Sequence, residues 1–374
     1  MYLKNAPSRP LILAPIKSET VFASSAISTK SPFNTFRIPS ICRCNNGTLL
    51  AFAEGRGSIQ DQSENVIVMR RLQPGANQWS SLQIVEQDKP NALNNPCVVV
   101  ARNGTVYLMY QRYPAGLNER SVKPGFSPTT TCETFLTTSK DDGLNWTEPV
   151  NLTRIVKKRA IWSDACGPGI GIQLHEGPHR GRIVFPFNEG RNGRYDDFVV
   201  YSDDGKTWHR SQPVPEPPNV QMNECQIVER SDGSILMNSR NQGPLAYRFT
   251  AISKNGGETW DMAQPDFALP APQCMGSIAR LSWDTNLIAL SNPSNQFHRK
   301  DGLVRFSFDD GRTWPESYPI DRGSFGYSCL VPMSNQSFGV LYEHFTTNAL
   351  GQQGYNILFK VFSILKSKDR VHQN

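Results

Sequence analysis

The sequence has no long hydrophobic run and no cluster of basic residues. Its longest apolar stretches, such as residues 49–53 and 66–69, are far shorter than the roughly 18 residues that cross a bilayer. The net charge of +6 is small for 374 residues, and the lysines and arginines are dispersed along the chain. We therefore expect neither a membrane span nor the basic surface of a nucleic-acid-binding protein.

Closely spaced cysteines are missing too. The eight cysteines are scattered without a C-x-x-C pair, which indicates buried thiols rather than a disulfide scaffold. We expect no metal and no cofactor. The first thirty residues hold no apolar stretch typical of a signal peptide. We expect a soluble protein, which is cytoplasmic if Met1 is the native start; a secreted or lysosomal location stays open if a leader has been removed.

Helical periodicity is the third absence. No segment keeps a 3.6-residue apolar repeat over about 12 residues with caps at both ends, which disfavours a helical or α/β fold. Short segments rich in Val, Ile, Leu and Phe instead predict strands; they are residues 48–53, 65–70, 182–187, 198–202, 287–291 and 303–307. Two hairpins are expected around Asn103-Gly104 and Asp232-Gly233, dipeptides typical of tight turns.

A short repeat is the strongest positive signal. The pattern S-x-D-(x)-G-x-T-W, with small departures, recurs at residues 139–146, 202–208, 253–260 and 307–314. An Asp or Asn side chain can bond the backbone two residues further on, Gly adopts positive φ, and Trp returns to a packed layer. Each copy therefore predicts a hairpin connection, and four copies at near-even spacing predict a repeated fold.

The repeat spacing predicts a closed propeller. A period of about 55–63 residues divides the chain into six or seven units, within the range of propeller blades. We expect one all-β domain over residues 1–374, with a lead-in over residues 1–30 and a frayed tail over residues 366–374. The late strand at residues 355–364 is expected to pair with N-terminal sequence, because a propeller must close its free edge.

Three motifs look chemical but are better explained as loops. Residues 175–179 match the zinc motif H-E-x-x-H, yet Gly and Pro fill its middle positions, and Pro disrupts the helix that this motif needs. The glycines at residues 167–171 lack the βαβ surroundings of a phosphate loop. Glu119, Arg120 and Lys123 are interpreted as a solvated loop.

Two further motifs accompany the repeats. The sequence Thr-Phe-Arg-Ile-Pro occupies residues 35–39, and Gly-Thr-Leu-Leu-Ala-Phe-Ala-Glu-Gly-Arg occupies residues 47–56. With the four repeats, which correspond to Asp boxes (BNR repeats), they resemble the sialidase (neuraminidase) superfamily, in particular its bacterial and animal lysosomal-type exo-sialidases. The resemblance extends from about residue 36 to residue 342 and implies a six-bladed β-propeller.

The resemblance implies a clamp for the carboxylate of sialic acid. A planar anion with two acceptor oxygens is best held by guanidinium forks, and the family uses three arginines. The matching positions are Arg37, Arg240 and Arg305. Glu343 matches the glutamate that orients the first arginine.

The resemblance also implies a tyrosine nucleophile. A carboxylate nucleophile would be repelled by the substrate's own carboxylate, whereas a neutral phenol is not, and sialidases differ in this way from ordinary two-carboxylate glycosidases. Tyr327 matches this nucleophile. Glu224 matches its partner base, which it needs because a phenol ordinarily has a pKa near ~10. Glu224 lies sixteen residues before Arg240, across the hairpin at Asp232-Gly233, so both can face one cavity.

Asp61 is expected to be the general acid/base. It lies in a loop within the matching region, before the strand at residues 65–70. Glu54, Arg56 and Asn95 are expected to line the pocket, with Glu54 the next candidate for the acid. Residues 162–171 are expected to shape the site for the substituent at C5 of the sugar.

The resemblance, carried by these residues, implies an exo-α-sialidase that works with retention through a covalent sialyl-tyrosine. Its partners are sialylated glycoproteins, glycolipids or oligosaccharides. Two alternatives stay open at the same site: trans-sialylation, or a preference for deaminated sialic acid. The third alternative is a non-catalytic glycan-binding propeller, which would be expected to lack Tyr327, Glu224 or Asp61.

Overall fold

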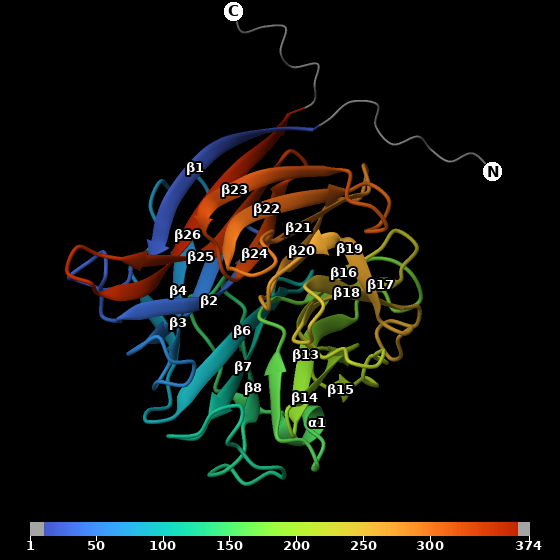
Figure 1. Ribbon diagram of the computed structural model, residues 1–374, viewed down its shortest axis with the longest axis horizontal. Coiled ribbons are helices and arrows are strands. Elements are labelled where there is room, and N and C mark those ends of the chain that lie inside the picture. Colours follow the sequence, from blue (N-terminus) through green and yellow to red (C-terminus); the bar gives the residue numbers. More distant parts are fainter. Residues whose placement is uncertain (1–10, 366–374) are drawn as a thin grey trace, which may run out of the picture.

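Six mostly antiparallel sheets surround a common axis in the computed structural model, which describes residues 11–365 (Figure 1). The first strand of a sheet lies nearest the axis, where β2 contacts both β6 and β24, and β20 contacts both β16 and β24. The fold is therefore a six-bladed β-propeller, as predicted. The tail expected at residues 366–374 lies outside the described residues.

The first three blades follow the chain in order. Blade 1 holds β2 (Thr35–Arg43), β3 (Leu49–Arg56), β4 (Val66–Leu72) and β5 (Gln83–Glu86). Blade 2 holds β6 (Ala92–Val100), β7 (Val106–Tyr113), β8 (Glu133–Ser139) and β9 (Val150–Asn151), with β11 (Gly169–Ile170) added parallel to β6. Blade 3 holds β10 (Ser163–Cys166), β13 (Ile183–Arg191), β14 (Arg194–Ser202) and β15 (His209–Arg210), with β12 (Ile172–Gln173) beside β13. Helix α1 (Thr153–Val156), four residues long, precedes blade 3.

The last three blades complete the ring. Blade 4 holds β16 (Met222–Glu229), β17 (Ile235–Asn241), β18 (Tyr247–Ser253) and β19 (Gln264–Pro270). Blade 5 holds β20 (Ser277–Ser282), β21 (Leu287–Pro293), β22 (Lys300–Ser307) and β23 (Glu316–Ser324). Blade 6 holds β24 (Ser328–Ser334), β25 (Ser337–Thr347), β26 (Gln353–Leu365) and β1 (Ile12–Phe22).

The N-terminal strand closes the ring. β1 runs antiparallel to β26 as the outermost strand of blade 6, with Ile12 opposite Leu365 and Phe22 opposite Ile357 (Figure 1). The expected pairing of the late strand with N-terminal sequence is thus confirmed. Within the stretch expected to be a lead-in, Ile12–Phe22 is consequently a strand of the propeller.

Each Asp box connects the third and fourth strands of its blade, in blades 2 to 5. In the first copy, the Ser139 hydroxyl accepts a hydrogen bond from the backbone N–H of Gly143 at 2.9 Å. The Asp141 carboxylate accepts one from the N–H of Asn145, also at 2.9 Å, and Gly143 has a φ of 78°. The repeat therefore folds as a turn that its own Ser and Asp side chains hold by hydrogen bonds to the backbone, as its composition predicts.

The tryptophan of the second Asp box packs between two blades. Trp208 is buried with Tyr107 and Met109 of blade 2 and with Phe185 of blade 3. Its ring meets that of Tyr107 edge-on, with the centroids 6.1 Å apart. Burying a large apolar side chain contributes about 1.5–3 kcal/mol, so contacts of this kind hold neighbouring blades together.

The zinc-like motif lies in a turn between β12 and β13, as its Gly-Pro pair predicts. The ring of His175 stacks on Trp283 with centroids 4.8 Å apart. Within residues 11–365, no helix has the length and apolar character needed to span a membrane.

Candidate active site

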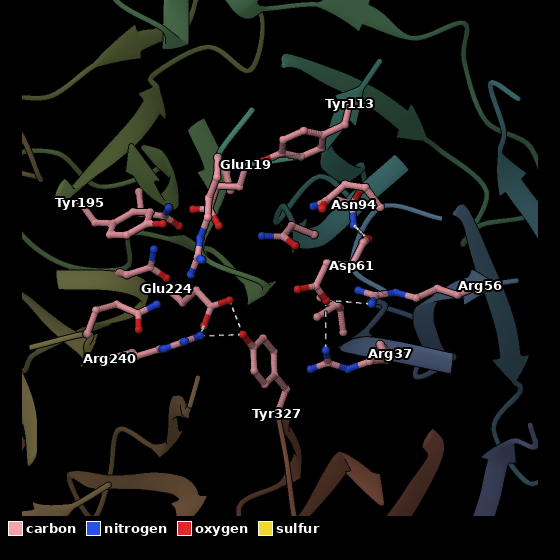
Figure 2. Close-up of a pocket in the computed structure, with 18 of the residues that line it drawn as sticks. Arg37, Arg56, Asp61, Asn94, Tyr113, Glu119, Tyr195, Glu224, Arg240 and Tyr327 are labelled. Atoms are coloured by element: carbon pink, nitrogen blue, oxygen red, sulfur yellow. Dashed lines mark hydrogen bonds and ion pairs between the residues drawn. The ribbon is translucent and has the colours of Figure 1, made fainter. Parts of the chain in front are cut away.

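One end of the ring carries a polar cavity of about 230 Å³. It lies where the first strands of the blades begin and the second strands end, so its wall is assembled from several blades (Figure 2). The predicted residues that line it are Arg37, Arg56, Asp61, Asn95, Glu224, Arg240 and Tyr327. The structure thus brings together seven of the ten residues that the sequence nominated.

Three β-bulges aim side chains into this cavity. Ile38, Asn95 and Glu224 have φ values of 59°, 55° and 56°, each at an irregularity in the pairing of the first and second strands of a blade. Neighbouring residues of a regular strand point to opposite faces. At each bulge two successive residues instead line the cavity, namely Arg37 and Ile38, Asn94 and Asn95, and Asn223 and Glu224. The positive φ values store backbone strain at the site.

Tyr327 lies directly before β24 and forms a hydrogen-bonded group with Glu224 and Arg240 (Figure 2). Its hydroxyl donates to the Glu224 carboxylate and accepts from Nη1 of Arg240 at 2.8 Å. Glu224 also pairs with Arg240. Burial, assisted by the negative charge of Glu224, raises the pKa of Tyr327 well above its ordinary value despite the nearby arginines. The phenol is therefore neutral at rest, and its proton is directed at a carboxylate.

Arg37 is held from behind by Glu343, which is fully buried. Nε and Nη2 of Arg37 donate to the two Glu343 oxygens at 3.0 and 3.1 Å. The same carboxylate accepts from the N–H groups of Ile38 and Tyr327 at 2.9 and 3.2 Å. Burial opposes the charge of Arg37, but Glu343, Tyr327 and Asp61 outweigh it and raise the pKa of the guanidinium. Glu343 therefore fixes the orientation of the Arg37 guanidinium group and leaves its Nη1 directed at the cavity.

The arginine that joins Arg37 and Arg240 around Tyr327 is Arg299, not Arg305. Arg299 precedes β22, and its guanidinium carbon lies 5.1 Å from the centre of the Tyr327 ring; that of Arg37 lies 5.2 Å from the same ring. Arg299 lines the cavity and donates to the Gln273 carbonyl at 3.0 Å.

Arg305 lies outside this group. It occupies the middle of β22, the third strand of blade 5, and donates to the Asn292 side chain at 2.7 Å. Burial lowers the pKa of Arg305 to about 10, although Asp266 partly offsets it. The strand register therefore carries Arg305 into the body of the blade, whereas the loop before β22 brings Arg299 to the cavity.

Asp61 pairs with two arginines at the mouth of the cavity (Figure 2). Its Oδ1 accepts from Nη1 of Arg56 at 2.9 Å and from Nη1 of Arg37 at 3.2 Å. The side chain is 64% exposed. Partial burial alone would raise the pKa of Asp61, but Arg56 and Arg37 outweigh burial and lower it. In the unliganded site Asp61 is thus ionised.

Glu54 does not line the cavity. It is fully buried behind the wall and accepts from Nε of Arg56 at 2.7 Å and from the N–H of Asn95 at 2.6 Å. It also accepts from the Asn94 amide at 3.2 Å. Burial raises the pKa of Glu54 despite the charge of Arg56. Glu54 and Arg56 lie two residues apart on β3, so their side chains point to the same face of the strand. Arg56 reaches the cavity wall, and Glu54 lies behind it and orients Arg56, Asn94 and Asn95.

No cluster of three or more His, Cys, Asp or Glu side chains within the described residues has the arrangement of a metal site. The charged groups of the cavity are instead the guanidinium donors and the carboxylates Asp61, Glu119 and Glu224. Such a donor set suits an anionic, hydroxyl-rich molecule.

Comparison with known proteins identifies the family. The family described as "BNR repeat-like domain" matches residues 47–340. A sialidase of Micromonospora viridifaciens is 31% identical over 334 residues, covering 85% of this chain and 51% of that protein. An exo-alpha-sialidase of Arthroderma benhamiae is 30% identical over 338 residues, covering 83% and 78%. The chain is a member of the sialidase superfamily.

This sialidase-superfamily chain also resembles solved structures. The crystal structure of the intramolecular trans-sialidase from Ruminococcus gnavus superposes with a TM-score of 0.77 at 19% identity, covering 95% of this chain and 99% of that one. The likeness shows the shared propeller. The chain spans about half the length of its Micromonospora relative.

Sequence reasoning missed part of this sialidase-family cavity. Glu119 and Arg120, interpreted as a solvated loop, line it together with Tyr113 and Tyr195. Burial and the charge of Glu224 raise the pKa of Glu119 to about 7. Glu119 and Arg120 lie in the loop between β7 and β8. This loop has no Asp-box or strand pattern, so the sequence gives no local signal that the loop reaches the cavity. Of residues 162–171, Ala165 lines the cavity.

Proposed function

We propose that the protein is an exo-α-sialidase that hydrolyses terminal α-linked sialic acids of glycoproteins, glycolipids or oligosaccharides with retention of configuration. One observation carries the proposal: a buried phenol, Tyr327, donates to Glu224 in a cavity lined by five arginines, three of which lie next to Tyr327. A substrate with a carboxylate on its reacting carbon requires both features, since the arginines hold the anion and the neutral nucleophile avoids its charge.

Arg37, Arg240 and Arg299 form the carboxylate clamp. All three line the cavity. Their guanidinium groups provide several charge-assisted donors in a site partly shielded from water, where such bonds are stronger than in solution. Glu343 positions Arg37, so one arginine is preorganised before the substrate arrives.

Tyr327 attacks the anomeric carbon in the first step. Its proton passes to Glu224 as the bond from the phenolic oxygen to the anomeric carbon forms. The glycosidic C–O bond breaks, and its electron pair goes to the leaving oxygen, which takes a proton from Asp61. The products are a covalent sialyl-tyrosine and the free alcohol of the aglycone.

Water completes the reaction in the second step. Asp61, now a carboxylate, accepts a proton from the water that attacks the anomeric carbon. The bond to Tyr327 breaks, and the phenolate recovers its proton from Glu224. Two displacements at one carbon give net retention. Asp61 becomes a competent acid once the substrate carboxylate replaces it on Arg37, because a pairing cation is lost and a like charge arrives.

Product analysis tests this proposal against its alternatives. Incubation with sialyllactose should release free sialic acid, and proton NMR should show the α-anomer first. Transfer to an acceptor sugar or an anhydro product would instead identify a transferase or an intramolecular enzyme. Binding without any turnover would identify a glycan-binding propeller. Sialosides with N-acetyl, N-glycolyl or deaminated C5 groups then define the preferred sugar.

A further inference from the structure

A second cavity adjoins the candidate active site. It has a volume of about 430 Å³, within the range of ligand pockets. Glu119, Arg120, Tyr195 and Gln242 line both cavities. The two cavities therefore share these side chains as a common wall, and a molecule in the first cavity lies beside the second.

Positive charge dominates the second cavity. Arg120 lies in the shared wall, and Arg191 and Arg194 come from the turn between β13 and β14. Arg191 is 57% exposed and approaches Asp196 only to 3.9 Å. Arg194 is exposed, and its charge partly offsets the rise that burial causes in the pKa of Glu216, a carboxyl outside the cavity wall. Glu119 is the one carboxylate among the described residues of its wall, and its pKa of about 7 leaves it partly protonated near neutral pH.

The rest of the wall suits a sugar ring. Trp162 presents an aromatic surface, and Gln221, Gln242 and Gln273 present amide groups. Aromatic rings pack against the apolar C–H faces of sugars, and amides can both donate to and accept from hydroxyl groups. A neutral sugar would be held by these groups but would leave the guanidinium groups without a counterion.

We infer that this cavity is a subsite for an anionic group on the sugar that is linked to the sialic acid in the active site. The inference rests on the proposed function. The group is a carboxylate or a sulfate, since both are planar or tripodal oxyanions that arginine forks bind. It comes either from a second sialic acid or from a sulfate ester on a neighbouring sugar. The protein therefore favours doubly anionic glycans over singly anionic ones.

Steady-state kinetics with three substrates test the subsite. The substrates are sialyllactose, disialyllactose with two linked sialic acids, and sialyllactose sulfated on galactose. For the parent enzyme, at least one doubly anionic substrate should have a higher kcat/KM than sialyllactose. The quantity to compare is the ratio of kcat/KM on the doubly anionic substrate to kcat/KM on sialyllactose. In the double variant Arg191→Gln/Arg194→Gln, this ratio should fall roughly tenfold, as expected for two partly exposed ion pairs. The ratio of the parent should also decline as salt is added.

A charge-matched control separates the subsite from general electrostatics. Arg180→Gln/Arg312→Gln removes two exposed arginines, of which Arg180 precedes β13 and Arg312 follows β22. Both lie at the strand ends away from the active site, so the ratio should keep its parental value.

Three outcomes decide the matter. A parental ratio in the Arg191/Arg194 variant, or an equal fall in the control, overturns the subsite. The substrate that loses its advantage identifies the source of the anion, namely the second sialic acid or the sulfate. No turnover of sialyllactose by the folded parent would instead contradict the proposed function, on which the subsite rests.

Discussion

The hydroxyl of Tyr327 donates a hydrogen bond to the carboxylate of Glu224, 103 residues earlier in the chain and two blades away. Arg240 contacts both groups, so it places a positive charge beside the oxygen that becomes partly anionic in the proposed attack. The pair forms because the innermost strands of different blades begin at the same end of the axis. The closure of the ring thus brings together the proposed nucleophile and its proposed base.

Removal of the proposed acid and removal of the proposed nucleophile should have different kinetic signatures. An alcohol needs a proton to leave, whereas an acidic phenol leaves without one. Asp61→Ala should therefore lose far more kcat/KM on sialyllactose than on an aryl sialoside. Tyr327→Phe should depress both substrates by a similar factor, because it removes covalent catalysis whatever the leaving group. The measurement is the ratio of kcat/KM on the aryl sialoside to kcat/KM on sialyllactose in each variant, and it should rise strongly in Asp61→Ala alone.

Glu54→Gln is the control for that ratio. Glu54 is buried and orients Arg56 and the bulge at Asn95, so its loss should lower activity on both substrates and leave the ratio near the parental value. A strong rise of the ratio in Glu54→Gln, with an unchanged ratio in Asp61→Ala, would transfer the role of acid to Glu54.

The clamp should depend on Arg299 and not on Arg305. Each charge-assisted hydrogen bond contributes about 1.5–3 kcal/mol, so Arg299→Ala should weaken binding of a transition-state analogue about 10- to 100-fold. Arg299→Lys should recover only part of this, since an ammonium forms no bidentate fork. Arg305→Ala should lower the melting temperature, because Asn292 loses its partner, but should bind the analogue like the parent. Calorimetric titration of the three variants measures the binding, and thermal melts measure the melting temperatures. A reversed order of the binding losses would restore Arg305 to the clamp.

The sequence nominates Arg305 for the cavity, whereas the structure places Arg299 there. This difference shows what a local sequence pattern cannot predict. Arg305 lies in a short apolar strand pattern before an Asp box, and a buried cation there suggested function. Whether a strand position faces the axis depends on the strand's rank in the blade, which local pattern does not encode. Arg299 lies in a polar segment, residues 295–300, that reads like any solvated loop.

The fold was more predictable than the site, for a physical reason. Turn chemistry and strand periodicity are local, so the Asp boxes and the hairpin at Asp232-Gly233 could be recognised without knowing the rest of the chain. The bulges at Ile38, Asn95 and Glu224 are not local preferences. None of these residues is a glycine, and their positive φ values persist only because the surrounding blades hold them.

Asp310 should link acid stability to blade packing. Its carboxylate accepts from Arg280 at 2.7 Å and from the N–H of Ser231 at 2.9 Å, which joins blades 4 and 5. Burial opposes its charge, but the bonds from Ser231 and Arg280 prevail and lower the pKa of Asp310 to about 2. The carboxylate therefore stabilises the fold above its unfolded pKa of ~3.9, and this stabilisation is lost as pH falls through about 2.

The variant Asp310→Asn tests this linkage. Its free energy of unfolding at pH 7 should be lower than that of the parent by roughly 1 kcal/mol after screening, and the deficit should shrink as pH falls from 4 towards 2. Denaturant melts at several pH values measure the difference, with the exposed Asp284→Asn as the reference. A deficit that does not change with pH would show that Asp310 acts through packing alone.

Chelation should leave turnover intact. His175 and His179 lie in a turn rather than on one face of a helix, and the His175 ring is stacked on Trp283. The proposed steps use only protein side chains and water. Assays of the purified protein before and after dialysis against EDTA should give equal kcat/KM. A loss that zinc restores would show that the histidine motif binds a functional metal.

Trapping of the covalent intermediate tests the central claim most directly. A sialosyl fluoride that carries a second fluorine at C3 should react quickly and hydrolyse slowly, because the electron-withdrawing fluorine destabilises both transition states while the fluoride leaving group speeds the first step. Intact-mass and peptide mass spectrometry should then find one fluorosialyl group on the peptide that contains Tyr327, and none in Tyr327→Phe. A stable adduct on Asp61, Glu224 or another residue of the parent would contradict the assignment of Tyr327 as the nucleophile.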